Sequence, residues 1–219
     1  MSRLHATLSW VEFFIPDALR QRSAEEHRRA QVGVAFAAAL AVWGPIYATL
    51  MGILFGTWHT SIAILVCTVT VISGPLMLRK IPHTAWLGNW TAGNLFWLMG
   101  YVAWFNGGHG GPSLMWLVAV PLFAMITAGN LSGLLWGIAS LGMVGGFYFA
   151  DQTGTVFPQE LDPGQFAFFD TTVLMGLVVL IAVLSMVFDS ITRWAMNEVQ
   201  EREAQAVQMV LDYLRTRPA

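Results

Sequence analysis

Apolar residues gather in six long runs along the chain, and short polar segments separate them. The runs cover residues 31–55, 61–78, 85–105, 114–128, 133–150 and 168–188. A helix needs about 20 apolar residues to cross the hydrocarbon layer of a membrane. The pattern therefore predicts an all-α, polytopic membrane protein, a bundle of six transmembrane helices that occupies residues 31–188.

The segment before the first run has a different pattern. Between residues 6 and 24, apolar side chains recur at helical spacing among charged ones, which predicts a short amphipathic helix. Such a helix either lies in the membrane interface or packs on the floor of the bundle. Pro16 is expected to break or bend it, and residues 1–30 are assigned to a cytoplasmic pre-helix.

The helix of the sixth run is predicted to continue beyond the membrane. Residues 189–214 contain no Gly or Pro and many good helix formers. At a spacing of about 3.5 residues they form an apolar seam, which Thr192 and Arg202 interrupt. The pattern indicates a weak parallel coiled coil, and hence a homodimer through the sixth helix and this segment, or a helix that packs on another neighbour. Residues 189–219 are therefore assigned to a cytoplasmic connector.

Composition strengthens the membrane prediction. Hydrophobic residues make up 56% of the chain and charged residues 11%, whereas soluble domains carry about 25% charged residues. The ten Trp residues are typical of the aromatic belts at the two lipid–water boundaries. The single cysteine, Cys67, lies in an apolar run, so no disulfide framework is predicted.

The placement of basic residues predicts the orientation. All eleven Lys and Arg residues fall on one side of a six-helix bundle whose two termini face the cytoplasm, as cytoplasmic segments usually require. Segments 56–60, 106–113 and 151–167 carry none, so we expect them to face outward. No apolar signal-peptide segment opens the chain, which also favours a cytoplasmic N-terminus.

No pattern of catalytic residues emerges. The segment GHGGP lacks the Lys and Ser/Thr of a phosphate-binding loop, which indicates a turn. The chain has no HExxH pair, and the only lysine, Lys80, falls at a membrane edge rather than in mid-bundle. His59 and His109 are both expected outside, but isolated loop histidines are more often solvated than metal-bound. No catalytic or metal-ligating residue is predicted.

The third run carries the most informative polar and aromatic residues. Asn94 lies in mid-span, where an unpaired amide is costly. It either hydrogen-bonds a neighbouring helix or lines a ligand pocket with the aromatic residues that follow on its face. An interfacial aromatic belt would give the same pattern. If a pocket exists, its candidate ligand-binding residues are Asn94, Trp97, Tyr101, Trp104, Gly107, Gly108, His109, Pro112 and Trp116.

Several features together carry a resemblance. They are the basic pre-helix FFIPDALRQRSAEEHRRAQ, six short spans, a GG-x-x-x-P turn after the third span, and an uninterrupted final helix. This arrangement resembles the N-terminal six-helix domains of bacterial sensor histidine kinases, including the redox-sensing RegB type and the quorum-sensing CqsS type. Membrane-anchored adenylyl and diguanylate cyclases have comparable domains.

The turn also resembles the RegB-type signature GGxxNPF, which is implicated in quinone sensing in that family. Gly107, Gly108 and Pro112 match it, whereas Gly111 and Ser113 stand where the signature has Asn and Phe. A quinone is thus the one cofactor that the resemblance suggests. These two departures remove a polar anchor and an aromatic ring, so the ligand stays unnamed.

The resemblance implies a function. We expect a sensor or receptor module in the bacterial inner membrane, which contacts lipid and passes a small, apolar signal to a C-terminal output domain. A histidine kinase is the first expectation for that output and a nucleotide cyclase the second. No catalytic domain and no nucleic-acid partner are predicted within this chain. The alternative is a small six-helix transporter or channel, which the scarcity of charge within the spans disfavours.

Overall fold

The computed structural model describes residues 9–182 together with 185, 186, 189, 200, 204, 205, 207 and 208. The chain divides into two compact units, Met1–Leu180 and Ile181–Ala219. The described residues of the second unit are helical. Most of the predicted connector, including Thr192 and Arg202, lies outside the described residues. The architecture below is that of the first unit.

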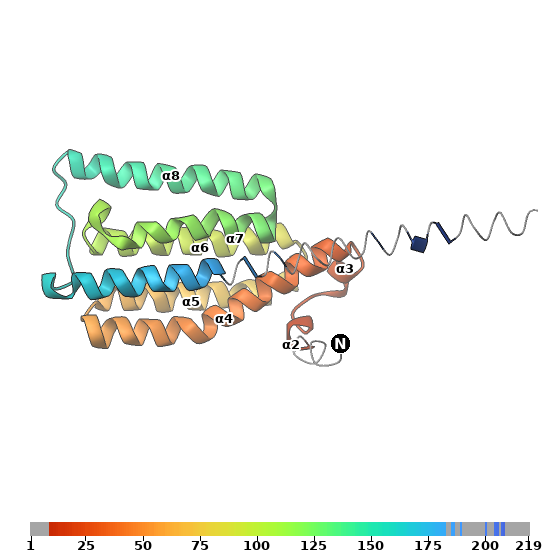
Figure 1. Ribbon diagram of the computed structural model, residues 1–219. Helices are drawn as coiled ribbons and strands as arrows, with labels where there is room; N and C mark the ends of the chain where they lie inside the picture. The colour runs from red at the N-terminus through yellow and green to blue at the C-terminus, as the bar shows by residue number, and fades with distance from the viewer. Residues whose placement is uncertain are drawn as a thin grey trace, which may run out of the picture. The chain divides into compact units, whose positions relative to one another are not determined.

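The described chain is all-α apart from one isolated β-bridge (Figure 1). Its elements are α2 (Ser9–Glu12), α3 (Asp17–Arg20), α4 (Ala24–Phe55), α5 (Trp58–Leu78), α6 (Thr84–Phe105), η1 (Gly108–Gly110), η2 (Pro112–Val118), α7 (Ala119–Ala128), α8 (Asn130–Gln152) and η3 (Pro163–Gln165). The last of these opens a helix that reaches Ala182, here named the 163–182 helix. The long helices pack in chain order, α4 on α5, α5 on α6, α6 on α7 and α7 on α8.

Four of the described helices are long and apolar enough to cross a membrane: Ala24–Phe55, Trp58–Leu78, Asn130–Gln152 and Pro163–Ala182. They indicate a multi-pass membrane protein. Helix α6 has 22 residues, but its Asn, Gly and Trp residues lower its mean hydropathy. The helical segment Pro112–Ala128 is shorter than the four. The count of six spans therefore stays a prediction.

The helices begin before the apolar runs that the sequence shows. The charged residues 25–30 lie inside α4 rather than before it. Ser23 caps this helix, since its side chain accepts a hydrogen bond from the Glu26 amide at 3.1 Å. Ser followed three residues later by Glu is a capping box, which explains the early start. Gly56, with φ 66°, ends the helix in the left-handed conformation.

The N-terminal segment forms two short helices where the sequence predicted one. Pro16 separates them and stands at the N-cap position of α3, with extended backbone angles. The apolar side chains of Val11, Ile15 and Leu19 are buried in a cluster with residues of α4, α5 and α6. The segment thus packs on the floor of the bundle.

A proline explains why the chain enters α7 through a 3₁₀ helix. Pro121 has no amide hydrogen for the carbonyl of Leu117, four residues earlier. The hydroxyl of Ser140, on α8, donates to that carbonyl at 3.4 Å. Nearby, a Cβ on Gly133 would lie 2.8 Å from the Cβ of Met125. Gly133 and Ser140 are the buried residues of α8, which therefore contacts the bundle along a narrow line.

Candidate functional site

Three connections meet at one end of the bundle, here named the loop end. They are the α4–α5 turn, residues 106–111 and residues 153–162. An antiparallel bridge joins Asn106 to Gln159. Around it the Glu160 amide donates to the Phe105 carbonyl at 3.0 Å, and the Gly107 amide donates to the Pro158 carbonyl at 3.3 Å. The predicted glycine turn and the long acidic loop are therefore bonded to each other.

Glu160 caps a helix that lies 100 residues earlier in the chain. Its carboxylate accepts from the amide of His59 at 2.8 Å, and from the amide and the hydroxyl of Thr60 at 3.2 Å each. The N-cap residue of α5, Thr57, makes no cap hydrogen bond, because its hydroxyl donates to the Met51 carbonyl. A carboxylate in this place satisfies amides without helical partners and interacts favourably with the helix dipole.

Asn106 extends this network into the bundle. Its side chain is fully buried, and its Nδ2 donates to the Thr60 hydroxyl at 3.1 Å and to the Val102 carbonyl at 2.9 Å. Its Oδ1 has no hydrogen-bond partner among the described residues. We name Glu160, Thr60, Asn106 and the His59 amide the loop-end network.

The glycines of the turn are needed for conformation and for space. Gly107 and Gly108 have φ values of 86° and 64°, which non-glycine residues rarely adopt. A Cβ on Gly108 would lie 2.3 Å from the ring of Phe157, and one on Gly111 would lie 2.4 Å from the carbonyl oxygen of Asn106. The turn can therefore approach Phe157 only because Gly108 lacks a side chain, and it can fold tightly on itself only because Gly111 does.

The aromatic residues of α6 divide between two neighbours. Trp97 stacks on Tyr101 at 5.2 Å between centroids, and this series continues through Phe105 to His59 of α5. Trp104 instead makes an edge contact with Phe157, at 5.2 Å. The sequence placed Trp97, Tyr101 and Trp104 on one face of α6; from that face Tyr101 contacts Phe105 and Trp104 contacts Phe157.

A shallow apolar hollow lies beside Trp104. Its volume is about 210 Å³, and its walls come from α6, α8 and the 153–162 loop. The lining residues are Trp104, Met143, Gly146, Phe147, Ala150 and Phe157. The hollow can receive an apolar group, and Trp104 is the candidate residue that reaches it.

The other candidate residues lie elsewhere. His109 makes an edge contact with Tyr148 of α8, and Pro112 is buried at the start of η2. The indole nitrogen of Trp116 donates to the Val173 carbonyl at 3.1 Å, which joins η2 to the 163–182 helix. The Asn94 side chain accepts a hydrogen bond from the Thr70 hydroxyl of α5 at 2.6 Å. This bond joins α6 to α5.

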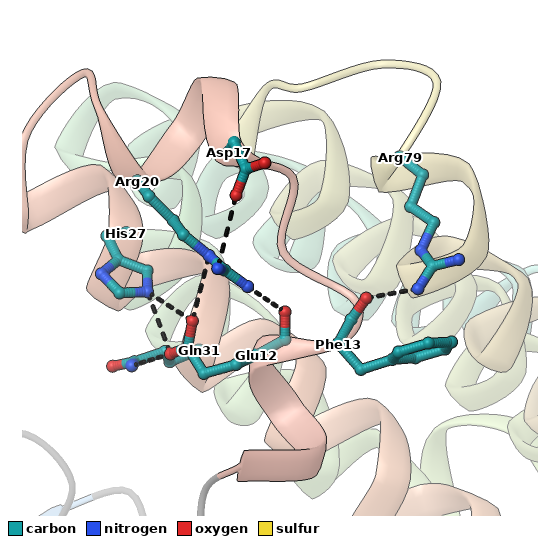
Figure 2. Close-up of polar contacts among 7 residues, drawn as sticks. All are labelled: Glu12, Phe13, Asp17, Arg20, His27, Gln31 and Arg79. Carbon is teal, nitrogen blue, oxygen red and sulfur yellow. Dashed lines mark hydrogen bonds and ion pairs between the residues drawn. The ribbon is translucent and has the colours of Figure 1, made fainter.

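The opposite end of the bundle, here named the basic end, holds a second polar network (Figure 2). Six of the eleven basic residues are described, and all lie at this end: Arg20, Arg22, Arg28, Arg29, Arg79 and Lys80. The Glu12 carboxylate lies 3.0 Å from Nε2 of His27 and 3.2 Å from Nε of Arg20, and it accepts from Gln31 at 2.6 Å. We name these four residues the basic-end network.

Arg79, at the end of α5, holds the same segment from another side. Its guanidinium donates to the Phe13 carbonyl and lies 4.0 Å from the centroid of the Phe13 ring (Figure 2). Burial on its own would raise the pKa of Glu12, but hydrogen bonds from Gln31 and His27 and the charges of His27 and Arg20 outweigh it. The pKa of Glu12 is therefore lowered, so the carboxylate is the favoured form.

Local sequence patterns do not predict the organising roles of Glu160 and Phe157. The sequence shows only that Glu160 is one of three acidic residues in a segment without basic ones. No local pattern links it to an amide 100 residues away.

No family model, curated protein or solved structure matches the chain. Among the described residues, no three His, Cys, Asp or Glu side chains lie together as metal ligands would. The geometry itself therefore carries the functional argument.

Proposed function

We propose that this protein is the membrane sensor module of a bacterial signal-transduction protein, most directly a histidine kinase. In this proposal six helices cross the inner membrane, and both termini and the basic end face the cytoplasm. A small apolar signal binds at the loop end. The 163–182 helix and the connector, paired in a homodimer, then transmit the change to a C-terminal output domain.

One observation supports this proposal more than any other. The Asn106–Gln159 bridge bonds the candidate turn to the loop that leads into the 163–182 helix, and Trp116, which follows the turn, donates to the Val173 carbonyl of that helix. A change in the turn therefore has two routes to the helix that precedes the predicted connector. A sensor needs such a mechanical connection between the place of binding and the output.

A chimera tests the proposal. Residues 1–219 are fused to the catalytic part of a reporter histidine kinase, and kinase output is compared in membranes. We expect Gly108→Ala and Trp116→Phe to change the output, while Gly110→Ala, whose Cβ meets nothing within 4 Å, leaves it unchanged. Membrane fractionation serves as the control for insertion. Equal output from all four chains, with normal insertion, would argue against a sensor.

The alternative of a transporter or channel has less support. Among the described residues, the buried polar side chains are Thr, Ser and Asn, without a charged group. Ion and proton pathways through membranes usually use buried ionisable residues. A flux assay in liposomes distinguishes the two functions.

A further inference from the structure

A stretch of nine residues performs four structural roles at the loop end. Phe157 forms a wall of the apolar hollow, and three residues later Glu160 caps α5. The next side chain, Leu161, is 3% exposed and belongs to a core cluster with residues of α4, α5 and α6. Two residues further on, Pro163 begins the 163–182 helix.

The start of that helix is also held by α4. The Gln165 side chain donates to the Leu54 carbonyl at 3.3 Å. The ring of Phe169 makes an edge contact with Phe55, with 5.4 Å between centroids. Residues 157–165 therefore join the end of α4, the start of α5, the end of α6 and the start of the 163–182 helix.

We propose that residues 157–165 form a latch, which Glu160 holds closed on α5 and which an apolar group in the hollow stabilises through Phe157. Closed, the latch fixes the first turns of the 163–182 helix. Open, it frees those turns and removes a wall from the hollow. The link to a signal rests on the proposed function, whereas the latch itself does not.

The closed state of the latch depends on the carboxylate of Glu160. Its two oxygens accept three hydrogen bonds from two consecutive residues of α5. An ionised carboxylate gives stronger bonds here than a neutral amide. A glutamine in its place keeps the size but loses the charge and one of the two acceptor oxygens, so the closed state should lose stability without a steric change.

The hollow and the latch are coupled because they share Phe157. A group that fills the hollow contacts Phe157 only in the closed state, so it shifts the equilibrium toward closure. By linkage, opening the latch must weaken the binding of that group by the same factor. Closing, rather than opening, is thus the response that an apolar ligand should produce.

Hydrogen–deuterium exchange of the full chain in lipid nanodiscs tests the latch. We expect Glu160→Gln to raise exchange roughly fivefold to tenfold in residues 58–61 and 153–165, the loss that removal of a helix cap produces, and to raise it in residues 166–172 as well. Asp151→Asn is the matched control, since it removes the same charge from an exposed position at the same end. Thr60→Val, which keeps the backbone cap, should give a smaller increase.

A side chain placed in the hollow tests the coupling without a known ligand. Gly146 lines the hollow, and a Cβ on it meets nothing within 4 Å. We expect Gly146→Leu to slow exchange in residues 153–165, whereas Gly142→Leu, one turn away and also in open space, leaves it unchanged.

Specific outcomes would overturn the proposal. Wild-type exchange in Glu160→Gln would exclude the latch, and faster exchange in the loop without a change in residues 166–172 would exclude its control of the helix. Equal exchange in the two leucine variants would exclude the coupling to the hollow. A silent reporter chimera beside a working latch would instead reject the sensor function alone.

Discussion

The two ends of the bundle are each organised around one glutamate, but the two carboxylates have different partners. Glu12 binds side chains, two of them from the basic residues Arg20 and His27. Glu160 binds two backbone amides and a hydroxyl. Charge pairs near a surface are screened by salt, whereas a cap also satisfies amides that have no other partner.

The sequence distances differ as well. Glu12 meets residues at most 19 positions away. Arg79 and His83 tie its segment to the end of α5 and the start of α6, through Phe13 and Arg22. Glu160 meets residues about 100 positions away. The basic end therefore fastens the start of the chain to the first three long helices, whereas the loop end joins early helices to a late one. A change in the loop end can for this reason reach the output helix.

Gly108→Ala should produce the largest difference in response between the loop end and the basic end. In the variant an alanine must adopt the left-handed backbone conformation of Gly108, and its Cβ would collide with the Phe157 ring. Together these two effects should lower the free energy of unfolding by about 1–3 kcal/mol. We expect lower stability in equilibrium unfolding in detergent and faster exchange at residues 106–111. Exchange at residues 9–22 should stay unchanged. In Gly110→Ala, both the stability and the exchange at residues 106–111 should stay unchanged. Faster exchange at both ends would show that they are not independent.

Glu12→Gln should produce the opposite difference, an effect at the basic end rather than at the loop end. Loss of the carboxylate removes the ion pair to Arg20 and weakens the hydrogen bond to His27, at a cost of about 1 kcal/mol because the site is partly exposed. Trypsin should cleave after Arg20 and Arg22 faster than in the wild type. Asp17→Asn is the control, since it removes the other carboxylate that pairs with Arg20; the Asp17 side chain is 83% exposed, so this pair should contribute little. Unchanged cleavage would mean that burial of Val11 and Leu19 holds the segment without help.

Acid should act on the basic end in a defined direction. The pKa of Glu12 is lowered from 4.5 in the folded protein, so the folded state binds fewer protons there than the unfolded state. Its contribution is complete above about pH 4.5 and is lost as the pH falls through the lower folded value. Exchange at residues 9–22, corrected for intrinsic pH dependence, should rise in acid. Glu12→Gln should remove the part of the rise that comes from protonation of Glu12. A rise of equal size in the variant would show that Glu12 does not cause it.

The smallest effect should come from the middle of the bundle. Asn94→Leu removes the hydrogen bond to Thr70, and such bonds contribute about 0.6 kcal/mol within membranes. Because Asn94 lies between the two ends, exchange at both should change little and equally. A change confined to the loop end would instead place Asn94 in the candidate ligand site.

Local patterns predicted much of the fold. Each apolar run lies within helical structure wherever the structure describes it. The helix starts were harder to predict, since the Ser23 cap starts α4 at Ala24, seven residues before the apolar run begins. Apolar residues report burial or lipid contact, whereas caps decide where a helix begins.

The candidate site was harder to predict than the helices. The positive φ values of Gly107 and Gly108 agree with a glycine turn, and that much follows from composition. The contacts of Phe105 with His59 and of Trp104 with Phe157 do not, because both partners come from distant parts of the chain. Contacts between distant loops are set by tertiary packing, which no window of sequence contains.

Helix α8 has a consequence for how this protein can change over evolutionary time. Its buried residues are Gly133 and Ser140, while Leu131, Leu141 and Phe149 are all more than 70% exposed. Lipid tails accept almost any apolar side chain, so most of α8 should drift freely among such residues. Gly133 lies against α7, and the Ser140 hydroxyl donates to the Leu117 carbonyl, for which Pro121 has no amide hydrogen. We expect these two positions to tolerate few substitutions.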